Sequence, residues 1–189
     1  YDGTAPATLD TTGATLVGVE NGDTVTLNAS LAAGTFADAL PATGKAVTVT
    51  GLTISGADAP NYDLVSPTPT ADITAVALTV TGVTVADKPY DGTTVATADY
   101  QAATLVGIQG LDTVTLDSHA ATAAFATADA GTAKAVTLTG LVLAGADAGN
   151  YTLTVPEPTA TITPLTVTFA LGDLAATYDG TAHAASVTA

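Results

Sequence analysis

The chain of 189 residues contains no cysteine, methionine, tryptophan or arginine. The absence of cysteine excludes disulfides, thiolate metal sites and cysteine nucleophiles. Only two histidines, His119 and His183, are available for acid–base chemistry near neutral pH, and neither has zinc ligands at a suitable spacing. We therefore expect a protein that is not an enzyme, with no catalytic residues and no cofactor.

Positive charge is also scarce. Eighteen acidic residues stand against three lysines, which gives a formal net charge of -15 at pH 7. This charge repels phosphate backbones and anionic membrane surfaces, so we expect no nucleic-acid partner. The longest apolar runs, such as residues 75–80, are much shorter than the roughly 18–20 residues that a membrane span needs. We expect no membrane insertion in this segment.

What the sequence has in abundance is repetition. Tyr-Asp-Gly occurs three times, and residues 1–80 and 90–169 are identical at 43 of 80 positions when they are aligned without a gap. The resulting period of 89 residues exceeds the roughly 20–50 residues of a solenoid unit and suits a small domain. We predict a first repeat without its opening strand, a complete second repeat, and the opening strand and turn of a third repeat, at residues 1–75, 76–164 and 165–189.

Within each period, valine, leucine and isoleucine alternate with threonine, as in residues 135–143 and 150–155. A period of two is typical of half-buried strands. No segment of ten or more residues shows a helical stripe, although residues 120–130 are rich enough in alanine to form a helical turn. The sequence predicts an all-β chain of tandem immunoglobulin-like β-sandwich domains. The alternative is a β-grasp-like repeat with one short helix.

Two details favour the sandwich. The apolar phase slips by one residue at Thr50–Gly51 and again at Thr139–Gly140, which predicts a bend that takes a strand around a corner. An aspartate also precedes a tyrosine by four residues at the start of a late strand, similar to the tyrosine corner of immunoglobulin-like sandwiches. The residues of this second motif are Asp58, Asn61 and Tyr62 in the first copy and Asp147, Asn150 and Tyr151 in the second.

We interpret the Tyr-Asp-Gly motif as a structural turn and not as a ligand-binding loop. Its aspartate can accept a hydrogen bond from the backbone two residues further on, and its glycine supplies a positive φ. The residues are Tyr1, Asp2 and Gly3 in the first copy and Tyr90, Asp91 and Gly92 in the second.

Two candidate sites concern the acidic residues and the lysines. Asp87, Asp91 and Asp147 could approach one another near a domain junction and bind calcium, although the spacing of a calcium loop is missing. The simpler interpretation of these aspartates is a solvated acidic surface. Lys45 and Lys134 recur at the start of one strand. Each could form an isopeptide bond with Asn61 or Asn150, or an ordinary surface ion pair with a nearby aspartate.

The motifs K-P-Y-D-G-T-T-x-A-T at residues 88–97 and G-A-D-A-x-N-Y-x-L at residues 145–153, with a closing I-T strand, resemble the YDG-type repeats of bacterial surface proteins. The piece that begins at Tyr178 is similar to the MBG repeats of the same proteins. The resemblance implies a structural repeat of an extracellular or cell-surface bacterial filament or adhesin stalk, without catalytic residues. Its partners would be neighbouring repeats of the same polypeptide, or identical copies in a filament. The alternative function is a carbohydrate- or host-surface-binding adhesive module.

The connection between the repeats predicts a stiff chain. The closing strand at residues 72–74 passes through residues 75–76 into the next opening strand without a Gly/Ser linker, so we expect a rigid acidic spacer. Residues 165–176 supply an opening strand with no domain to complete. Either the array continues, or this segment completes the first domain of another copy by strand complementation.

Overall fold

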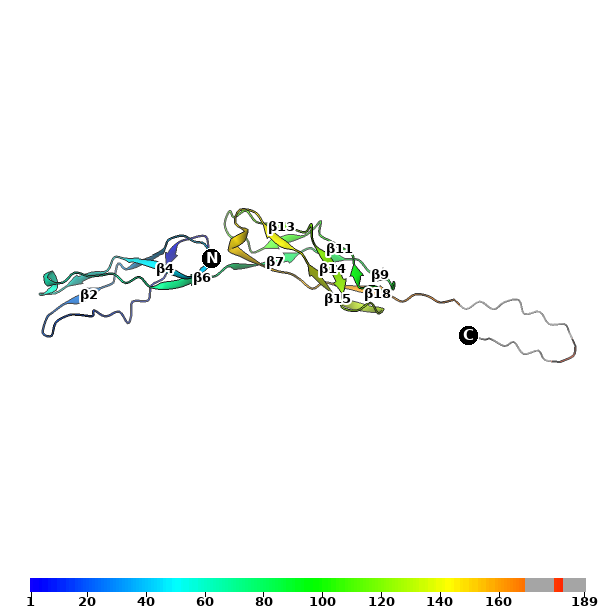
Figure 1. Ribbon diagram of the computed structural model, residues 1–189, viewed down its shortest axis with the longest axis horizontal. Helices are drawn as coiled ribbons and strands as arrows, with labels where there is room; N and C mark the ends of the chain where they lie inside the picture. The colour runs from blue at the N-terminus through cyan, green and yellow to red at the C-terminus, as the bar shows by residue number, and fades with distance from the viewer. Residues whose placement is uncertain (169–178, 182–189) are drawn as a thin grey trace.

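The computed structural model describes residues 1–168 and 179–181, and over these residues the chain is all-β apart from two short 3-10 turns. The first unit (residues 1–75) and the second unit (residues 76–164) follow one another end to end, and the N-terminus lies between them (Figure 1). Among the described residues, no helix is long and apolar enough to cross a membrane. The predicted all-β, sandwich-type fold is confirmed.

The first unit consists of one antiparallel four-stranded sheet and one antiparallel pair of strands. The sheet has the order β1 (Pro6–Ala7), β3 (Ala33–Phe36), β4 (Ala42–Thr50) and β6 (Thr70–Ile73). The pair is β2 (Thr26–Asn28) with β5 (Thr53–Ser55), and the 3-10 turn η1 (Ala59–Asn61) follows.

The second unit has a five-stranded sheet, a three-stranded sheet and two strand pairs. The five-stranded sheet has the order β10 (Val95–Ala96), β14 (Thr122–Phe125), β15 (Gly131–Thr139), β18 (Thr159–Thr163) and β9 (Lys88–Pro89). In the three-stranded sheet, β7 (Val76–Thr81) runs antiparallel to β12 (Thr104–Val106) and parallel to β17 (Tyr151–Thr154). The pairs are β8 (Thr84–Val85) with β11 (Ala98–Asp99) and β13 (Thr115–Asp117) with β16 (Val142–Ala144), and the turn η2 (Ala148–Asn150) precedes β17.

The bend expected at the phase slip is present in both units. Gly140 lies between β15 and β16, which belong to different sheets, and has φ +76°. A Cβ atom at Gly140 would lie 2.2 Å from the backbone oxygen of Ala120, and one at Gly51 would lie 2.0 Å from that of Leu31. Only glycine fits this corner, because the backbone is left-handed there and the neighbouring chain passes within contact distance.

The helical turn considered for residues 120–130 is not formed. Residues 122–125 make strand β14, which pairs with β15, and Phe125 at its end is buried. The 3-10 turns lie elsewhere, at η1 and η2. Packing of Phe125 and pairing with a long neighbour outweigh the helical preference of the alanines here.

The two units differ in how well their cores are closed. Among the described apolar side chains of the first unit, only Val47 and Val49 are buried, whereas Phe36 is half-buried. Strand β7 accounts for much of the difference, because it contributes the fully buried Leu78 and Val80 to the second unit. The buried apolar residues of the second unit are Leu78, Val80, Ala96, Val114, Phe125, Val136, Leu138, Leu141, Tyr151, Ala160 and Ile162.

Candidate functional site

A polar cluster that joins both units lies where they meet. The ring of Tyr1 stands edge-on to that of Tyr151, with centroids 5.7 Å apart and an interplanar angle of 75°. The Tyr1 hydroxyl donates a hydrogen bond to Asp112 Oδ2 at 2.8 Å and accepts one from Asn150 Nδ2 at 3.0 Å. A residue at the start of the first unit is thus bound by three side chains of the second.

Tyr151 fixes the same carboxylate from inside the second unit. Its hydroxyl donates to Asp112 Oδ2 at 2.6 Å and accepts from the backbone nitrogen of Gln109 at 2.9 Å. Asn150 and Tyr151 are each only 6% exposed. We call Asp112, Asn150 and Tyr151 the second tyrosine socket, because together they receive the ring and hydroxyl of Tyr1.

The socket favours the neutral form of both phenols. The hydrogen bond to Asp112, together with burial, raises the pKa of Tyr1 to about 12. Burial, followed by the hydrogen bond to Asp112, also raises the pKa of Tyr151. A neutral phenol can donate to a carboxylate, whereas a phenolate would repel it. The contact is therefore intact at neutral pH.

A second connection at the joint runs through the backbone. The amino group of Tyr1 donates to the backbone oxygen of Thr74 at 2.7 Å. Only Thr74 and Ala75 separate the end of β6 from the start of β7. Tyr1 therefore contacts both the connecting segment and the socket, and a change in the angle between the units would strain these contacts.

The first unit contains the equivalent socket. Tyr62 donates to Asp23 Oδ2 at 2.7 Å and accepts from the backbone nitrogen of Glu20 at 3.0 Å, and the hydrogen bond to Asp23 raises the Tyr62 pKa. We call Asp23, Asn61 and Tyr62 the first tyrosine socket. The exposed Asn61 side chain makes no hydrogen bond with any described residue, so this socket has no counterpart of Tyr1 within residues 1–168 and 179–181.

The aspartate at the start of each socket motif clamps a loop. Asp147 Oδ2 accepts a hydrogen bond from the backbone nitrogen of Thr113 at 2.8 Å, and Asp58 Oδ2 accepts the equivalent one from Thr24 at 2.8 Å. These bonds hold the loop that precedes β2 in the first unit against η1, and the loop that precedes β13 in the second unit against η2. They also fix Asp112 and Asp23, the residues directly before these threonines, beside the tyrosines.

Each Tyr-Asp-Gly copy forms a turn held by its aspartate. Asp2 accepts hydrogen bonds from the backbone nitrogen and hydroxyl of Thr4, at 2.9 and 2.8 Å. Asp91 does the same with Thr93, at 2.9 and 2.9 Å. The glycines have φ of 76° in Gly3 and 75° in Gly92. The described part of the third copy repeats both features at Asp179, Gly180 and Thr181.

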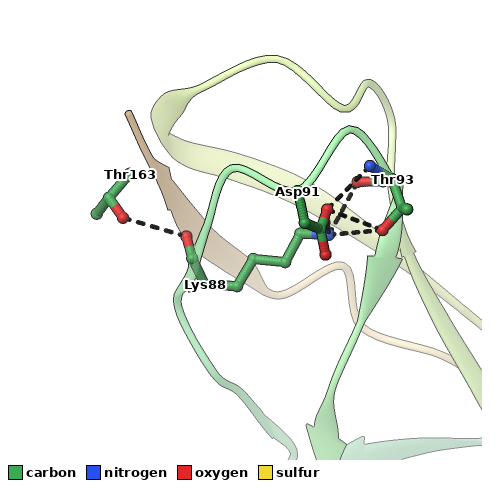
Figure 2. Close-up of polar contacts among 4 residues, drawn as sticks. All are labelled: Lys88, Asp91, Thr93 and Thr163. Carbon is green, nitrogen blue, oxygen red and sulfur yellow. Dashed lines mark hydrogen bonds and ion pairs between the residues drawn. The ribbon is translucent and has the colours of Figure 1, made fainter. Parts of the chain in front are cut away.

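In the second unit a lysine reinforces this turn (Figure 2). Lys88 Nζ lies 2.8 Å from Asp91 Oδ1 and 2.8 Å from the backbone oxygen of Thr93. The ammonium group also lies 5.7 Å from the centre of the Phe125 ring, a cation–π contact. Lys88, followed by the hydrogen bonds from Thr93, lowers the pKa of Asp91 to about 2.

The structure does not bring the three candidate calcium ligands together. Asp87 accepts a hydrogen bond from the backbone nitrogen of Thr161 at 2.6 Å, Asp91 is paired with Lys88, and Asp147 clamps Thr113. Within residues 1–168 and 179–181, no group of three or more histidine, aspartate or glutamate side chains is placed to share a metal ion. These carboxylates shape turns and loops.

Both lysines considered for an isopeptide bond make other contacts. Lys45 forms an ion pair with Asp38, the plainer of the two alternatives. Lys134 instead donates to Thr127 Oγ1 at 2.7 Å, because threonine stands where the first unit has Asp38, and Asn150 bonds to Tyr1.

His119 adds no site. The side chain of His119 is 97% exposed beside Asp117. His183 lies outside the described residues.

Sequence reasoning missed Asp112 and Asp23, the acceptors of both sockets. One signal could have identified them. The three preceding residues differ between the copies, Glu20-Asn-Gly against Gln109-Gly-Leu, yet the aspartate is the same in both. An identical residue in a variable loop indicates a contact that both copies make.

The family model for the YDG domain matches residues 1–71 and 74–162. The chain belongs to the YDG domain family. No curated protein and no solved structure matches it. The joint thus links two successive YDG matches, with Tyr1 in the first and the second tyrosine socket in the next.

Proposed function

We propose that this pair of YDG domains is a structural segment of an extracellular bacterial filament or adhesin stalk, in which it acts as a rigid, acidic spacer. The observation on which the proposal rests is the joint between the units. Tyr1 is bound by Asp112, Asn150 and Tyr151 while its own unit continues directly into β7.

The joint favours stiffness because it limits rotation in two ways. The connecting segment is too short to act as a flexible linker. Any large swing would also remove the Tyr1 hydroxyl from Asp112 and leave the buried Asn150 amide without its acceptor. Losing a partner for a buried polar group is costly, so the aligned arrangement is preferred.

The charge supports the same role. With a formal net charge of -15, copies repel one another over distances up to the Debye length, roughly 8–10 Å at physiological salt. Lys45 and Lys88 are already paired with Asp38 and Asp91. The remaining acidic surface opposes side-by-side association of neighbouring stalks, as a stalk at a cell surface requires.

The spacer function can be tested by building one, two and three tandem copies between a surface anchor and an epitope tag. The height of the epitope above the anchor should increase in proportion to the number of copies. A flexible chain would instead extend with about the square root of its length. Square-root growth, or no growth, would contradict the proposal.

A matched control sharpens this test. Tyr1→Ala in every copy removes the joint contact and should shorten the average height, whereas Leu31→Ala, at an exposed corner residue, should not. If both variants behave as the parent does, the joint is not the source of stiffness.

A further inference from the structure

The first unit has an open apolar cleft of about 600 Å³. Its lining includes Leu16, Val25, Ile54 and Tyr62. The counterparts of these residues in the second unit enclose Leu78 of β7, and they are Leu105, Val114, Leu143 and Tyr151. The cleft of the first unit therefore corresponds to the place that β7 fills in the second.

An extended stretch of sequence with the pattern of β7 follows β18. Continuing the gap-free alignment of the repeats places Leu165 at the position of Val76 and Val167 at the position of Leu78. Leu78 is 0% exposed, but Leu165 is 61% and Val167 is 92% exposed. These apolar side chains alternate with threonine, as in β7, and have no cover among the described residues.

Tyr90 also lacks the contact that its counterpart Tyr1 makes in the second tyrosine socket. Its backbone nitrogen donates to the oxygen of Thr163 at 2.8 Å, just as that of Tyr1 donates to Thr74. Unlike Tyr1, it is 40% exposed, and its hydroxyl makes no hydrogen bond with any described residue. Strand β9, which ends one residue before Tyr90, and residues 164–168 lie at the end of the second unit that faces away from the first unit (Figure 1).

We propose that the second unit of one copy docks onto the first unit of another copy, with residues 165–168 entering the apolar cleft and Tyr90 entering the first tyrosine socket. This inference rests on the proposed structural function and names its partner, a second copy of this chain. The new joint repeats the one seen at Tyr1. Donor and acceptor lie at opposite ends of the molecule (Figure 1), so the contact is head-to-tail and propagates into a filament.

The second unit fixes the register of the docked strand. There, β17 pairs with β7 in parallel, with Tyr151 opposite Val76 and Thr154 opposite Thr79, and β12 pairs antiparallel, with Val106 opposite Thr79. By the repeat alignment, Leu165 of one copy lies opposite Tyr62 of the next. Thr168 lies opposite Val17, and their counterparts in the second unit, Thr79 and Val106, are both exposed.

Cysteine cross-linking tests this register, because the chain has no cysteine of its own. The matched variant combines Val17→Cys with Thr168→Cys. The control combines Val17→Cys with Thr166→Cys, on the same strand face but two residues out of register. In about 0.15 M salt, which screens the acidic surfaces, mild oxidation should give a ladder of covalent multimers, several-fold stronger for the matched pair. Equal ladders, or none, would overturn the proposal.

Sedimentation of the unmodified chain tests the tyrosine contact. The wild type should self-associate as its concentration rises, and Tyr90→Ala should weaken the association at least about tenfold, as expected for an aromatic anchor at an interface. Leu31→Ala truncates an exposed apolar residue outside the cleft lining and the socket, and should leave the self-association unchanged. A monomeric wild type, or a Tyr90→Ala variant that associates normally, would refute this joint.

The two proposals fail separately. If the chain stays monomeric in solution but the height of the epitope still increases in proportion to the number of tandem copies, the spacer function holds and docking between copies is excluded. If the matched cysteine pair cross-links but the height of the epitope does not depend on the number of tandem copies, docking between copies holds and the spacer function is excluded.

Discussion

Tyr1 and Tyr151 meet edge to face, with ring centroids 5.7 Å apart, and both hydroxyls donate to the same oxygen of Asp112. Tyr90 occupies the same position in its own Tyr-Asp-Gly motif but is exposed. One sequence motif thus supplies a turn in every copy, and an inter-unit contact only where a socket lies within reach.

The first prediction separates these two roles. Tyr1→Phe keeps the ring but removes the hydroxyl that Asn150 and Asp112 bind, so the joint should loosen while both units stay folded. Small-angle scattering of a dilute sample should show a broader distribution of overall lengths. Tyr90→Phe is the matched control and should leave the distribution unchanged. Identical curves for the two variants would mean that the Tyr1 hydroxyl does not hold the joint.

The joint should also respond to alkaline pH. The pKa of Tyr1 is raised from 10.0 to about 12, so the folded joint favours the neutral phenol. Its stabilising contribution is fully present below pH 10 and is lost as the pH rises through about 12. Scattering measured from pH 8 to 12.5 should show the units uncoupling in the upper part of this range, and Tyr1→Phe should lack the component due to Tyr1. A rod that keeps its length distribution up to pH 12.5 would contradict this expectation.

The strands and the corner could be predicted from the sequence because both are local properties. Alternating apolar residues indicated β15, and the phase slip at Thr139–Gly140 indicated the bend. Strand β14 was ambiguous because alanine has little strand preference, and its state depends on pairing with β15 and burial of Phe125.

The candidate site was much harder to predict. Tyr1 and Asp112 are 111 positions apart, and their contact depends on how two whole units are oriented. The cleft is likewise a tertiary feature. Its lining residues are ordinary core residues in the repeat pattern, and only the structure shows that they enclose an open space.

Strand β7 should dominate the stability of the second unit. Leu78 is fully buried, so Leu78→Ala should lower the free energy of unfolding by about 2–5 kcal/mol. Val167→Ala removes an exposed side chain at the equivalent repeat position and should have almost no effect in dilute solution. Urea unfolding followed by circular dichroism measures both. A large loss in Val167→Ala would indicate that this segment is already packed within a single molecule.

The two units should also differ in local stability. Strand β4 of the first unit borders the open cleft through Val49, whereas β14 and β15 of the second unit contribute Phe125, Val136 and Leu138 to a buried core. Backbone amides in regions with few buried contacts open more often. Hydrogen exchange with mass spectrometry should therefore show faster exchange in peptides from residues 33–50 than in peptides from residues 122–139. The difference should shrink as the concentration rises and copies fill one another's clefts.

The corner glycine provides the last prediction. Gly140 has φ +76°, and a Cβ atom there would meet the Ala120 oxygen at 2.2 Å, so Gly140→Ala combines backbone strain with a backbone clash. The free energy of unfolding of the second unit should fall by at least about 2 kcal/mol. Gly149→Ala is the matched control, because no atom lies within 4 Å of its added Cβ and its φ is not in the left-handed region. Urea unfolding of the two variants should therefore differ clearly. Equal midpoints would mean that the chain can turn between the two sheets without the left-handed residue, and the corner would then be set by the strands on either side of it.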